Sequence, residues 1–362
     1  MALSPNAVRR WLAAGVILSV ATAISACRVA PGPKPVFRRD LRPFGFPTQT
    51  LGRIVGSFSD VGFLSNDLLL VTVNTQTFGA DDETPSDLPE SKLLLFDITR
   101  QTLLNSVDAP VEKSPDSVQS AGNGSFVLLN REGVQICSLS LECGRPVDTR
   151  GPLYLSPQGT RIAVGGHGRW EQKILNGTTL AELQSFAKNE PKVIPGDDGV
   201  LYGQKGQLFV KLPDRPEPQL VLDEIGTDVW PNARFLDANT IAALQFDKTM
   251  TVATLDGKVL FRIRGEGKSY LTEVSTTASG SRFCLHDAGY TGLRSVLAFL
   301  DFEKPFNLER VNVMDVRSGR SRLKLQWDPQ PYVGNLTRPA LSPDGHRLAI
   351  IKHGFVEVYY IR

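Results

Sequence analysis

Short apolar runs, not a helical repeat, dominate the chain from Leu51 onward. No 3.6-residue spacing of apolar positions persists there, and runs rich in Val, Ile, Leu and Phe alternate with Gly, Asp, Asn and Pro. The clearest runs come in pairs joined by a tight turn, as in "MTVATLDGKVLFRI". Asp256-Gly257 and Asn176-Gly177 are strong two-residue hairpin signals, because glycine adopts the positive φ that such turns require. The pattern predicts an all-β protein built from antiparallel hairpins.

The hairpins group into units of four strands, which we call a, b, c and d. Strand d is expected in the first six units, but the chain ends at Arg362 before a seventh d strand can form. At the other end, the strand-like run Leu51–Gly56 has no a, b or c strand before it. We therefore predict that this run completes the last unit. Strand c is expected to begin near Lys92, Val134, Glu171, Gln207, Thr249, Arg310 and Phe355.

These units predict a seven-bladed β-propeller of four-stranded antiparallel blades over residues 51–362, closed by an N-terminal strand that completes the last blade. Each unit is about 45 residues long, the usual length of a propeller blade. A blade built from both chain ends closes the ring and leaves no unpaired sheet edge there. Six or eight blades are the alternatives, because the second unit is irregular.

Two segments carry a resemblance to a known family. "LSPDGHRLAI" and "LSPQGTRIAV" resemble the Ser-Pro-Asp-Gly repeats of WD-repeat-like propellers found in exported bacterial proteins. Pro157 and Pro343 hold the proline place of that repeat, where Pro and Gly shape the turn between strands a and b. No unit combines the Gly-His and Trp-Asp pairs that mark a true WD repeat. The resemblance implies a fold and does not imply one chemistry.

Residues 1–26 have the pattern of an export signal. Arg9 and Arg10 precede an apolar run of about 16 residues, which is short for a membrane span of about 20. Ile24 to Cys27 resembles the lipobox of bacterial lipoproteins, which implies that Cys27 is diacylated and becomes the new N-terminus. A plain signal peptide cut nearby and an uncleaved anchor are the alternatives.

Residues 27–50 are rich in proline and arginine. Proline disfavours helix and suits an extended tether between the leader and the propeller. On an acylated chain the basic residues would lie near the lipid headgroups, and a soluble spacer is the alternative. These basic residues are Arg28, Lys34, Arg38, Arg39 and Arg42.

The charge balance argues against nucleic-acid binding. The formal net charge is +2, and the leader accounts for it, so the mature chain is expected to carry no net charge. The sequence has no basic stripe with interleaved aromatic residues. We expect a monomer in the bacterial envelope, at the outer membrane or in the periplasm, with a secreted soluble protein as the alternative.

Two long b–c connections mark a candidate binding face. In propellers, the b–c and d–a connections emerge on one face. Residues 74–91 belong to unit one and residues 287–309 to unit six, so they flank unit seven on that face. In the alternative, the acidic connection is disordered and the aromatic residues of the second pack on their own blade. The candidate binding residues in these connections are Asp81, Asp82, Glu83, Tyr290 and Phe299.

Three histidines fall at or just after the end of strand b. They are His167, His286 and His353, and all would point to the same face. Asp287 follows His286 and offers an acid/base pair in sequence, while Trp170 lies close to His167. Solvated turn histidines are the alternative. The sequence lacks a GxSxG elbow, a P-loop, an HExxH motif and a dinucleotide fingerprint, and we expect no cofactor.

Cysteine usage fits an oxidising compartment. Cys137 and Cys143 enclose a short segment of the second unit, where a hairpin would place them opposite one another; two free thiols are the alternative. Cys284 lies in an apolar strand and is expected to be a buried apolar residue. The spacing of the cysteines and histidines matches no metal-ligand pattern, so we expect no metal.

Together these features favour an exported, lipid-anchored, non-enzymatic module that binds or scaffolds an envelope protein or a glycan. The alternative is a hydrolase or lyase that acts on polysaccharide or peptide at the propeller mouth. His167, His286, Asp287 and His353 would be its candidate residues.

Overall fold

The structure is a computed structural model that describes most of the propeller and none of residues 1–31. The chain divides into two compact units, Met1–Lys34 and Pro35–Arg362, and all the described strands lie in the second. The described residues are 32–46, 60–74, 91–109, 118–122, 124–130, 133–149, 151, 153–165, 171–187, 190–223, 233–244, 249–264, 270–277, 279–289, 308–327 and 339–362.

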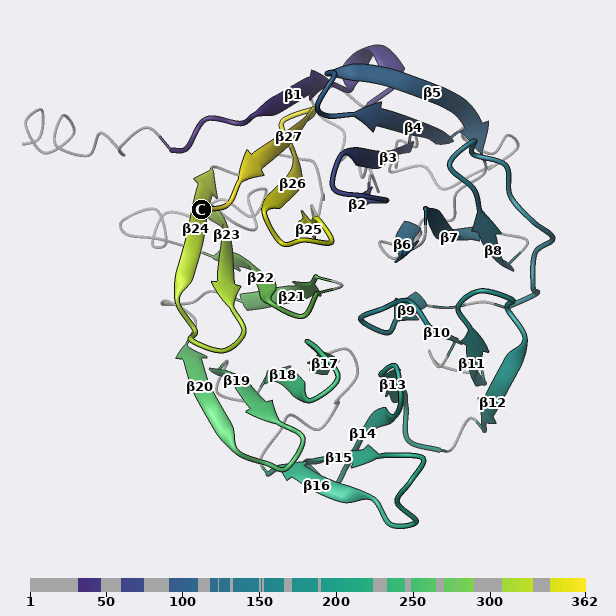
Figure 1. Cartoon of the computed structure of the whole chain (residues 1–362), viewed down its shortest axis with the longest axis vertical. Helices are drawn as coiled ribbons and strands as arrows, with labels where there is room; N and C mark the ends of the chain where they lie inside the picture. Colours follow the sequence, from purple (N-terminus) through teal and green to yellow (C-terminus); the bar gives the residue numbers. More distant parts are fainter. Residues whose placement is uncertain are drawn as a thin grey trace, which may run out of the picture. The chain divides into compact units, whose positions relative to one another are not determined.

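The strands of the second unit form seven antiparallel sheets arranged in a ring, which confirms the predicted seven-bladed propeller (Figure 1). Within a blade each strand pairs with the next one along the chain, except in blade seven, where β1 pairs with β27. Blade one has β2 (Val61–Phe63), β3 (Leu68–Asn74), β4 (Ser91–Asp97) and β5 (Thr102–Ala109). Blade two has β6 (Val118–Gly122), β7 (Ser125–Asn130) and β8 (Gly133–Cys137). Blade three has β9 (Leu153–Leu155), β10 (Arg161–Gly165), β11 (Gln172–Asn176) and β12 (Glu182–Phe186).

The other four blades complete the ring. Blade four has β13 (Val193–Pro195), β14 (Val200–Gln204), β15 (Gln207–Lys211) and β16 (Gln219–Leu222). Blade five has β17 (Ala233–Phe235), β18 (Thr240–Leu244), β19 (Thr249–Thr254) and β20 (Val259–Arg264). Blade six has β21 (Tyr270–Thr276), β22 (Arg282–Gly289), β23 (Leu308–Asp315) and β24 (Ser321–Trp327). Blade seven has β25 (Ala340–Leu341), β26 (Arg347–Lys352), β27 (Phe355–Tyr360) and, from the other end of the chain, β1 (Phe37–Asp40).

Blade seven confirms closure by an N-terminal strand but corrects the segment that supplies it. The outer edge of β27 is covered by β1, with Phe37 opposite Val358 and Asp40 opposite Phe355. The prediction of Leu51–Gly56 for this place was wrong, and those residues lie outside the described part of the chain. Residues 27–50 are likewise not all tether, because they contain β1 and the 3-10 helix η1 (Arg42–Phe44).

The physical reason for that error lies in the composition of β1. As the outermost strand, it contributes backbone hydrogen bonds and buries one apolar side chain, Phe37, while Arg38 and Arg39 face solvent. A run of apolar residues, which is the usual sign of a strand in a sequence, is therefore missing from β1. The backbone N–H of Val36 donates to the carbonyl oxygen of Val358 (2.7 Å), and that of Leu41 donates to the carbonyl oxygen of Gly354 (2.8 Å). These hydrogen bonds extend the pairing beyond both ends of β1.

Blade two is the irregular one, as its sequence indicated. It has three named strands, and the segment after β8 makes two isolated bridges instead of a fourth strand. One bridge joins Val134 to Val147 and the other joins Cys137 to Cys143. The ring thus has six four-stranded blades and one blade with a partial fourth strand.

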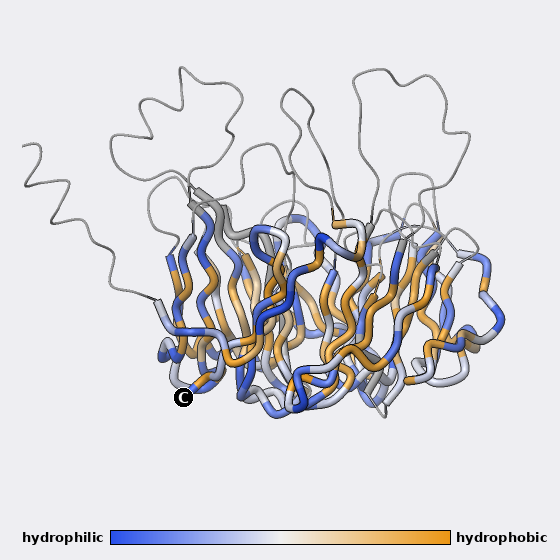
Figure 2. The backbone as a smooth tube through the Cα atoms, turned by 90° about the horizontal axis from the view of Figure 1, so that it is seen from above, coloured by the Kyte–Doolittle hydropathy of each residue, from blue (hydrophilic) through white to orange (hydrophobic). Residues whose placement is uncertain are grey.

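The core lies between neighbouring blades. Between blades seven and one, for example, Phe37 packs on Phe96 with ring centroids 5.7 Å apart, and both side chains are buried. Burial of such a side chain contributes about 1.5–3 kcal/mol. Figure 2 shows apolar stretches running along the strands, with polar residues at the turns. We call the face that carries the b–c connections the upper face, and the face with the a–b and c–d turns, where the C-terminus lies, the lower face.

Candidate binding site around blade seven

The two faces differ in the length of their connections. On the lower face, the a–b turns of blades six, seven and one span only residues 277–281, 342–346 and 64–67. On the upper face, residues 75–90 join β3 to β4 in blade one, and residues 290–307 join β22 to β23 in blade six. These are the two long b–c connections that the sequence predicted.

Blade seven lies between those connections. Residues 328–339, which lead from β24 to β25, add a third long connection at its upper end. Its own β26–β27 turn is short and consists of His353 and Gly354, both with positive φ (52° and 77°). This left-handed pair is typical of two-residue hairpin turns. The upper end of blade seven is therefore a short turn bordered by long connections from both neighbouring blades.

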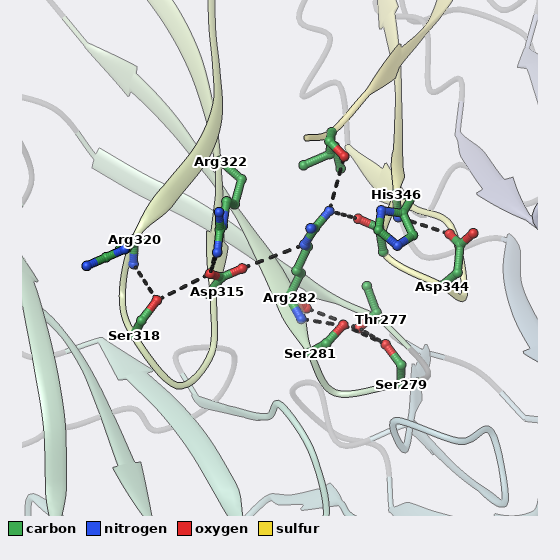
Figure 3. A network of polar contacts seen from close by, with 12 residues as sticks. Thr277, Ser279, Ser281, Arg282, Asp315, Ser318, Arg320, Arg322, Asp344 and His346 are labelled. Atoms are coloured by element: carbon green, nitrogen blue, oxygen red, sulfur yellow. Dashed lines mark hydrogen bonds and ion pairs between the residues drawn. The ribbon is translucent and has the colours of Figure 1, made fainter.

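The lower face is held by side chains that cross from blade to blade. Figure 3 shows Arg282, at the start of β22, between Asp315 and the a–b turn of blade seven. The Nη1 of Arg282 donates to the carbonyl oxygens of Gly345 (2.7 Å) and Ile361 (3.4 Å) in blade seven. Its Nε lies 3.6 Å from Asp315 Oδ1. Since both side chains are largely buried, this network fixes blade six against blade seven.

Asp315 also receives a hydrogen bond from Arg322 Nε at 2.7 Å. This bond from Arg322 lowers the pKa of Asp315 below its usual value, although burial acts in the opposite direction. Asp315 is therefore a carboxylate held in its charged form by arginine, as a structural ion pair requires.

A second crossing joins blade seven to blade one. Arg347 Nη1 lies 2.8 Å from Asp67 Oδ1 and also bonds to the carbonyl oxygen of Asn66. A hydrogen bond from the Thr99 hydroxyl, and then the bond from Arg347, lower the pKa of Asp67. In the Ser-Pro-Asp-Gly turn, Asp344 accepts a bond from the Ser342 hydroxyl (2.6 Å), which assigns it to turn geometry.

On the upper side of the interface between blades six and seven, four side chains, including His286, form a cluster. The His286 ring is 1% exposed and stacks on Trp327, with centroids 6.4 Å apart and planes 6° from parallel. His286 Nε2 lies 3.5 Å from Glu309 Oε2. Lys352 Nζ, from β26 of blade seven, lies 5.7 Å from the centroid of the Trp327 ring. The cluster therefore connects three strands of blade six with blade seven.

The cluster changes the interpretation of His286. The sequence placed it next to Asp287, and in the structure its Nε2 lies near a carboxylate oxygen of Glu309 on the adjacent strand β23. Strand register decides this contact, and register is not visible in one sequence. With 1% of its surface exposed, His286 offers almost no contact area to a substrate, and the geometry is that of a buried packing element.

The remaining predicted residues divide into two groups. His353 is exposed in the β26–β27 turn, and Asp287 continues β22. The others lie outside the described residues, so their predicted roles stay predictions: Cys27, Asp81, Asp82, Glu83, His167, Trp170, Tyr290 and Phe299.

A cluster that site prediction missed lies beside the β26–β27 turn. The guanidinium of Arg38 lies 3.8 Å from the centroid of the Phe355 ring, and that of Arg42 lies 4.9 Å from it. Arg42 also forms two bonds to Asp40, at 2.8 and 2.7 Å, and these lower the pKa of Asp40. The arginines were visible in the sequence, but their place on blade seven depends on β1.

The cysteines form a covalent link in blade two. The Sγ atoms of Cys137 and Cys143 lie 2.00 Å apart, as in a disulfide, and their Cα atoms are 4.0 Å apart. The link joins β8 to the segment that stands in for a fourth strand. Cys284 is buried in the apolar cluster between blades six and seven.

The described residues contain neither a metal-binding cluster nor a membrane-spanning helix. No group of three His, Cys, Asp or Glu side chains there has an arrangement that could hold a metal ion. Within the same ranges, no helix is both long enough and apolar enough to cross a membrane.

Comparisons with known proteins do not assign the chain to a family. No protein-family model matches the chain, and no curated protein matches it. Among solved structures, the chain is similar to the crystal structure of Kluyvelomyces marxianus Hsv2, with a TM-score of 0.45 and 10% sequence identity, over 66% of this chain and 69% of that one. A likeness at this level carries no statement about function.

Proposed function

We propose that this protein is an exported, lipid-anchored binding module that holds an envelope protein or a glycan on the upper face around blade seven. Export and acylation at Cys27 are supported by the leader and its lipobox-like end. A propeller is compatible with a binding or scaffold role.

The observation that carries the proposal is the placement of the long connections. Residues 75–90, 290–307 and 328–339 all join strands at the upper end of blades six, seven and one, whereas the lower turns of the same blades are short. Long connections on a rigid scaffold are where binding residues concentrate. The acidic residues of the first connection and the aromatic residues of the second supply contrasting chemistry for one partner.

A non-enzymatic role is favoured by the burial of His286, which is the best acid/base candidate in the sequence. His286 is buried against Trp327 and Glu309, and His353 is an exposed turn residue on the next blade. An acid/base catalyst must come within hydrogen-bond reach of the proton that it transfers, and the burial of His286 limits that reach.

The test is chemical crosslinking in intact cells followed by affinity capture. Full-length protein is compared with a variant in which Thr75 to Glu90 and Tyr290 to Asn307 are replaced by short Gly/Ser turns. A control variant replaces the lower-edge turn 212–218 with Gly/Ser of the same length. Mass spectrometry of the mature N-terminus measures acylation of Cys27 independently.

We expect one partner to be captured by the full-length protein and the control variant, and lost with the trimmed variant. Because loop-closure entropy changes slowly with loop length, the free energy of unfolding of the trimmed variant should change by less than about 1 kcal/mol. Equal capture by all three proteins would contradict the upper-face site, and an unmodified N-terminus would contradict the lipid anchor.

A further inference from the structure

The outer strands of blades five, six and seven form a basic surface. These strands are β20, β24 and β1, and Figure 1 shows them in succession along one side of the ring. The most exposed charged side chains on them are basic, and the half-buried acidic residue of β1, Asp40, is paired with Arg42. We call this set the basic rim, and its members are Arg262, Arg264, Arg322, Lys324, Arg38 and Arg39.

The outer strands on the other side of the ring have the opposite character. In β5, β12 and β16, the exposed charged side chains are Asp108 and Glu182, both acidic. The c–d turns of blades five and six extend the contrast, because Lys258, Arg317 and Arg320 are exposed there with Asp256 as the exposed acid. Since the mature chain is expected to carry no net charge, this is a segregation of charge and not a general excess of it.

Much of the basic rim has no acidic side chain beside it. Arg38 is paired with Glu357 at 3.0 Å, and Arg322 is paired with Asp315. In the described part of the chain, no Asp or Glu forms an ion pair with the other members, which are Arg39, Arg262, Arg264 and Lys324. Their positive charge is therefore available to an anionic surface.

The position of the N-terminal segment provides a second, independent observation. β1 is itself the outer strand of blade seven, so the chain enters the propeller at the basic rim. Only the residues between Cys27 and Val36 separate the expected acylation site from the first strand, and at full extension they reach about 30 Å at most. β1 thus shortens the tether well below the residues 27–50 that the sequence suggested.

We propose that the basic rim docks on the anionic phospholipid headgroups of the membrane that holds the lipid anchor. The inference rests on the lipid anchoring in the proposed function. Exposed arginine and lysine side chains are attracted to an anionic bilayer while they remain hydrated. The attraction acts within about one Debye length, which is close to 8 Å at physiological salt. The short tether keeps the rim near the bilayer.

Docking by the rim has a consequence for the ring. It holds the propeller edge-on to the membrane, so that neither flat face lies against the lipid. The upper face around blade seven stays open to a partner, while the anchor and the rim together fix its height. Partner binding and membrane docking therefore use different residues.

The experiment measures binding of residues 28–362, which include every described residue and no acylation site, to phospholipid vesicles. Vesicles of phosphatidylcholine are compared with vesicles in which about a third of the lipid is phosphatidylglycerol. The rim variant is Arg39→Glu, Arg262→Glu, Arg264→Glu and Lys324→Glu. The control variant makes the same change of net charge on blades two and four: Arg145→Glu, Lys205→Glu, Lys211→Glu and Arg215→Glu.

We expect the wild-type propeller to bind the anionic vesicles and not the phosphatidylcholine vesicles. The binding should be lost as the salt concentration is raised. The rim variant should bind at least about tenfold more weakly, and the control variant should stay within about twofold of wild type. Equal loss in both variants would reduce the effect to net charge and overturn the proposal. Binding to a soluble anionic polysaccharide, such as alginate, without binding to vesicles would overturn it as well.

The two proposals fail separately. The rim variant leaves the connections on the upper face intact, and the trimmed variant leaves the basic rim intact. A protein that is acylated and captures its partner, yet does not bind anionic vesicles, would refute the basic rim alone. Circular dichroism of each variant confirms that the fold is retained.

Discussion

At the interface of blades six and seven, the lower face and the upper face use the same strands differently. On the lower face, short turns meet, and Arg282 crosses between the blades to reach Gly345 and Ile361. On the upper face, the strands continue into the connections 290–307 and 328–339. The contacts of the lower face therefore stabilise the ring, while the upper face carries the long connections that we propose for binding. Changes on the lower face should therefore cost stability, and changes on the upper face should cost binding.

The largest expected effect comes from a pair of glycines on opposite faces. A Cβ at Gly280, in the lower turn of blade six, would lie 2.4 Å from Asp237 Cβ in blade five, whereas at Gly354, in the upper turn of blade seven, it would lie 3.4 Å from the flexible Arg42 side chain. Both residues have positive φ, so each alanine adds strain of about 1–2 kcal/mol. Overpacking adds about 1–3 kcal/mol more for Gly280→Ala alone. Urea unfolding of the two variants measures the difference, and equal losses would contradict the role given to the lower turns.

A smaller loss is expected for Arg282→Ala. The substitution removes the donor to two carbonyl oxygens of blade seven and one partner of Asp315. Leaving buried polar groups unpaired should lower the free energy of unfolding by about 2–3 kcal/mol. Arg282→Lys keeps the charge but not the planar fork, so its loss should be intermediate. Arg322→Ala, at an exposed position on the same carboxylate, should cost far less, and a loss as large as that of Arg282→Ala would contradict the interblade role.

The smallest effect is a dependence of stability on pH. Because hydrogen bonding from Arg322 lowers the pKa of Asp315 in the folded state, its stabilisation is complete above the unfolded pKa of about 3.9 and is lost as the pH falls through the lower, folded value. Asp315→Asn should weaken the protein at pH 7 and should flatten the fall in stability below about pH 4. Thermal melts between pH 7 and pH 3 test this, and an unchanged acid slope would contradict it.

The sequence allowed the blade count and the long connections to be predicted, because both depend on local signals. Turn pairs such as Asp256-Gly257 set the rhythm of the strands, and the length of a connection is visible as the distance between apolar runs. The closing strand was placed in the wrong segment, since β1 has a single buried apolar residue, Phe37. Edge strands are held by backbone hydrogen bonds, which every residue except proline can form, so the composition of the segment does not identify them.

The contacts between distant residues were not predictable from one sequence. The pairing of His286 with Glu309 depends on the register of β22 and β23. The contact of Arg347 with Asp67 exists only because the ring brings blade seven back to blade one. The basic rim was partly visible, since Arg38 and Arg39 stood out in the N-terminal segment. Their alignment with Arg262 and Lys324 required the order of the outer strands around the ring.

The most direct test of the binding face uses two exposed histidines of blade seven. His353 lies in its upper turn and His346 in its lower turn, so a photo-crosslinking amino acid placed at one or the other reports on each face of the same blade. After irradiation of intact cells, we expect a covalent adduct with a partner from position 353 and none from position 346. Adducts from position 346 alone, or equal adducts from both positions, would contradict the assignment of the upper face to binding.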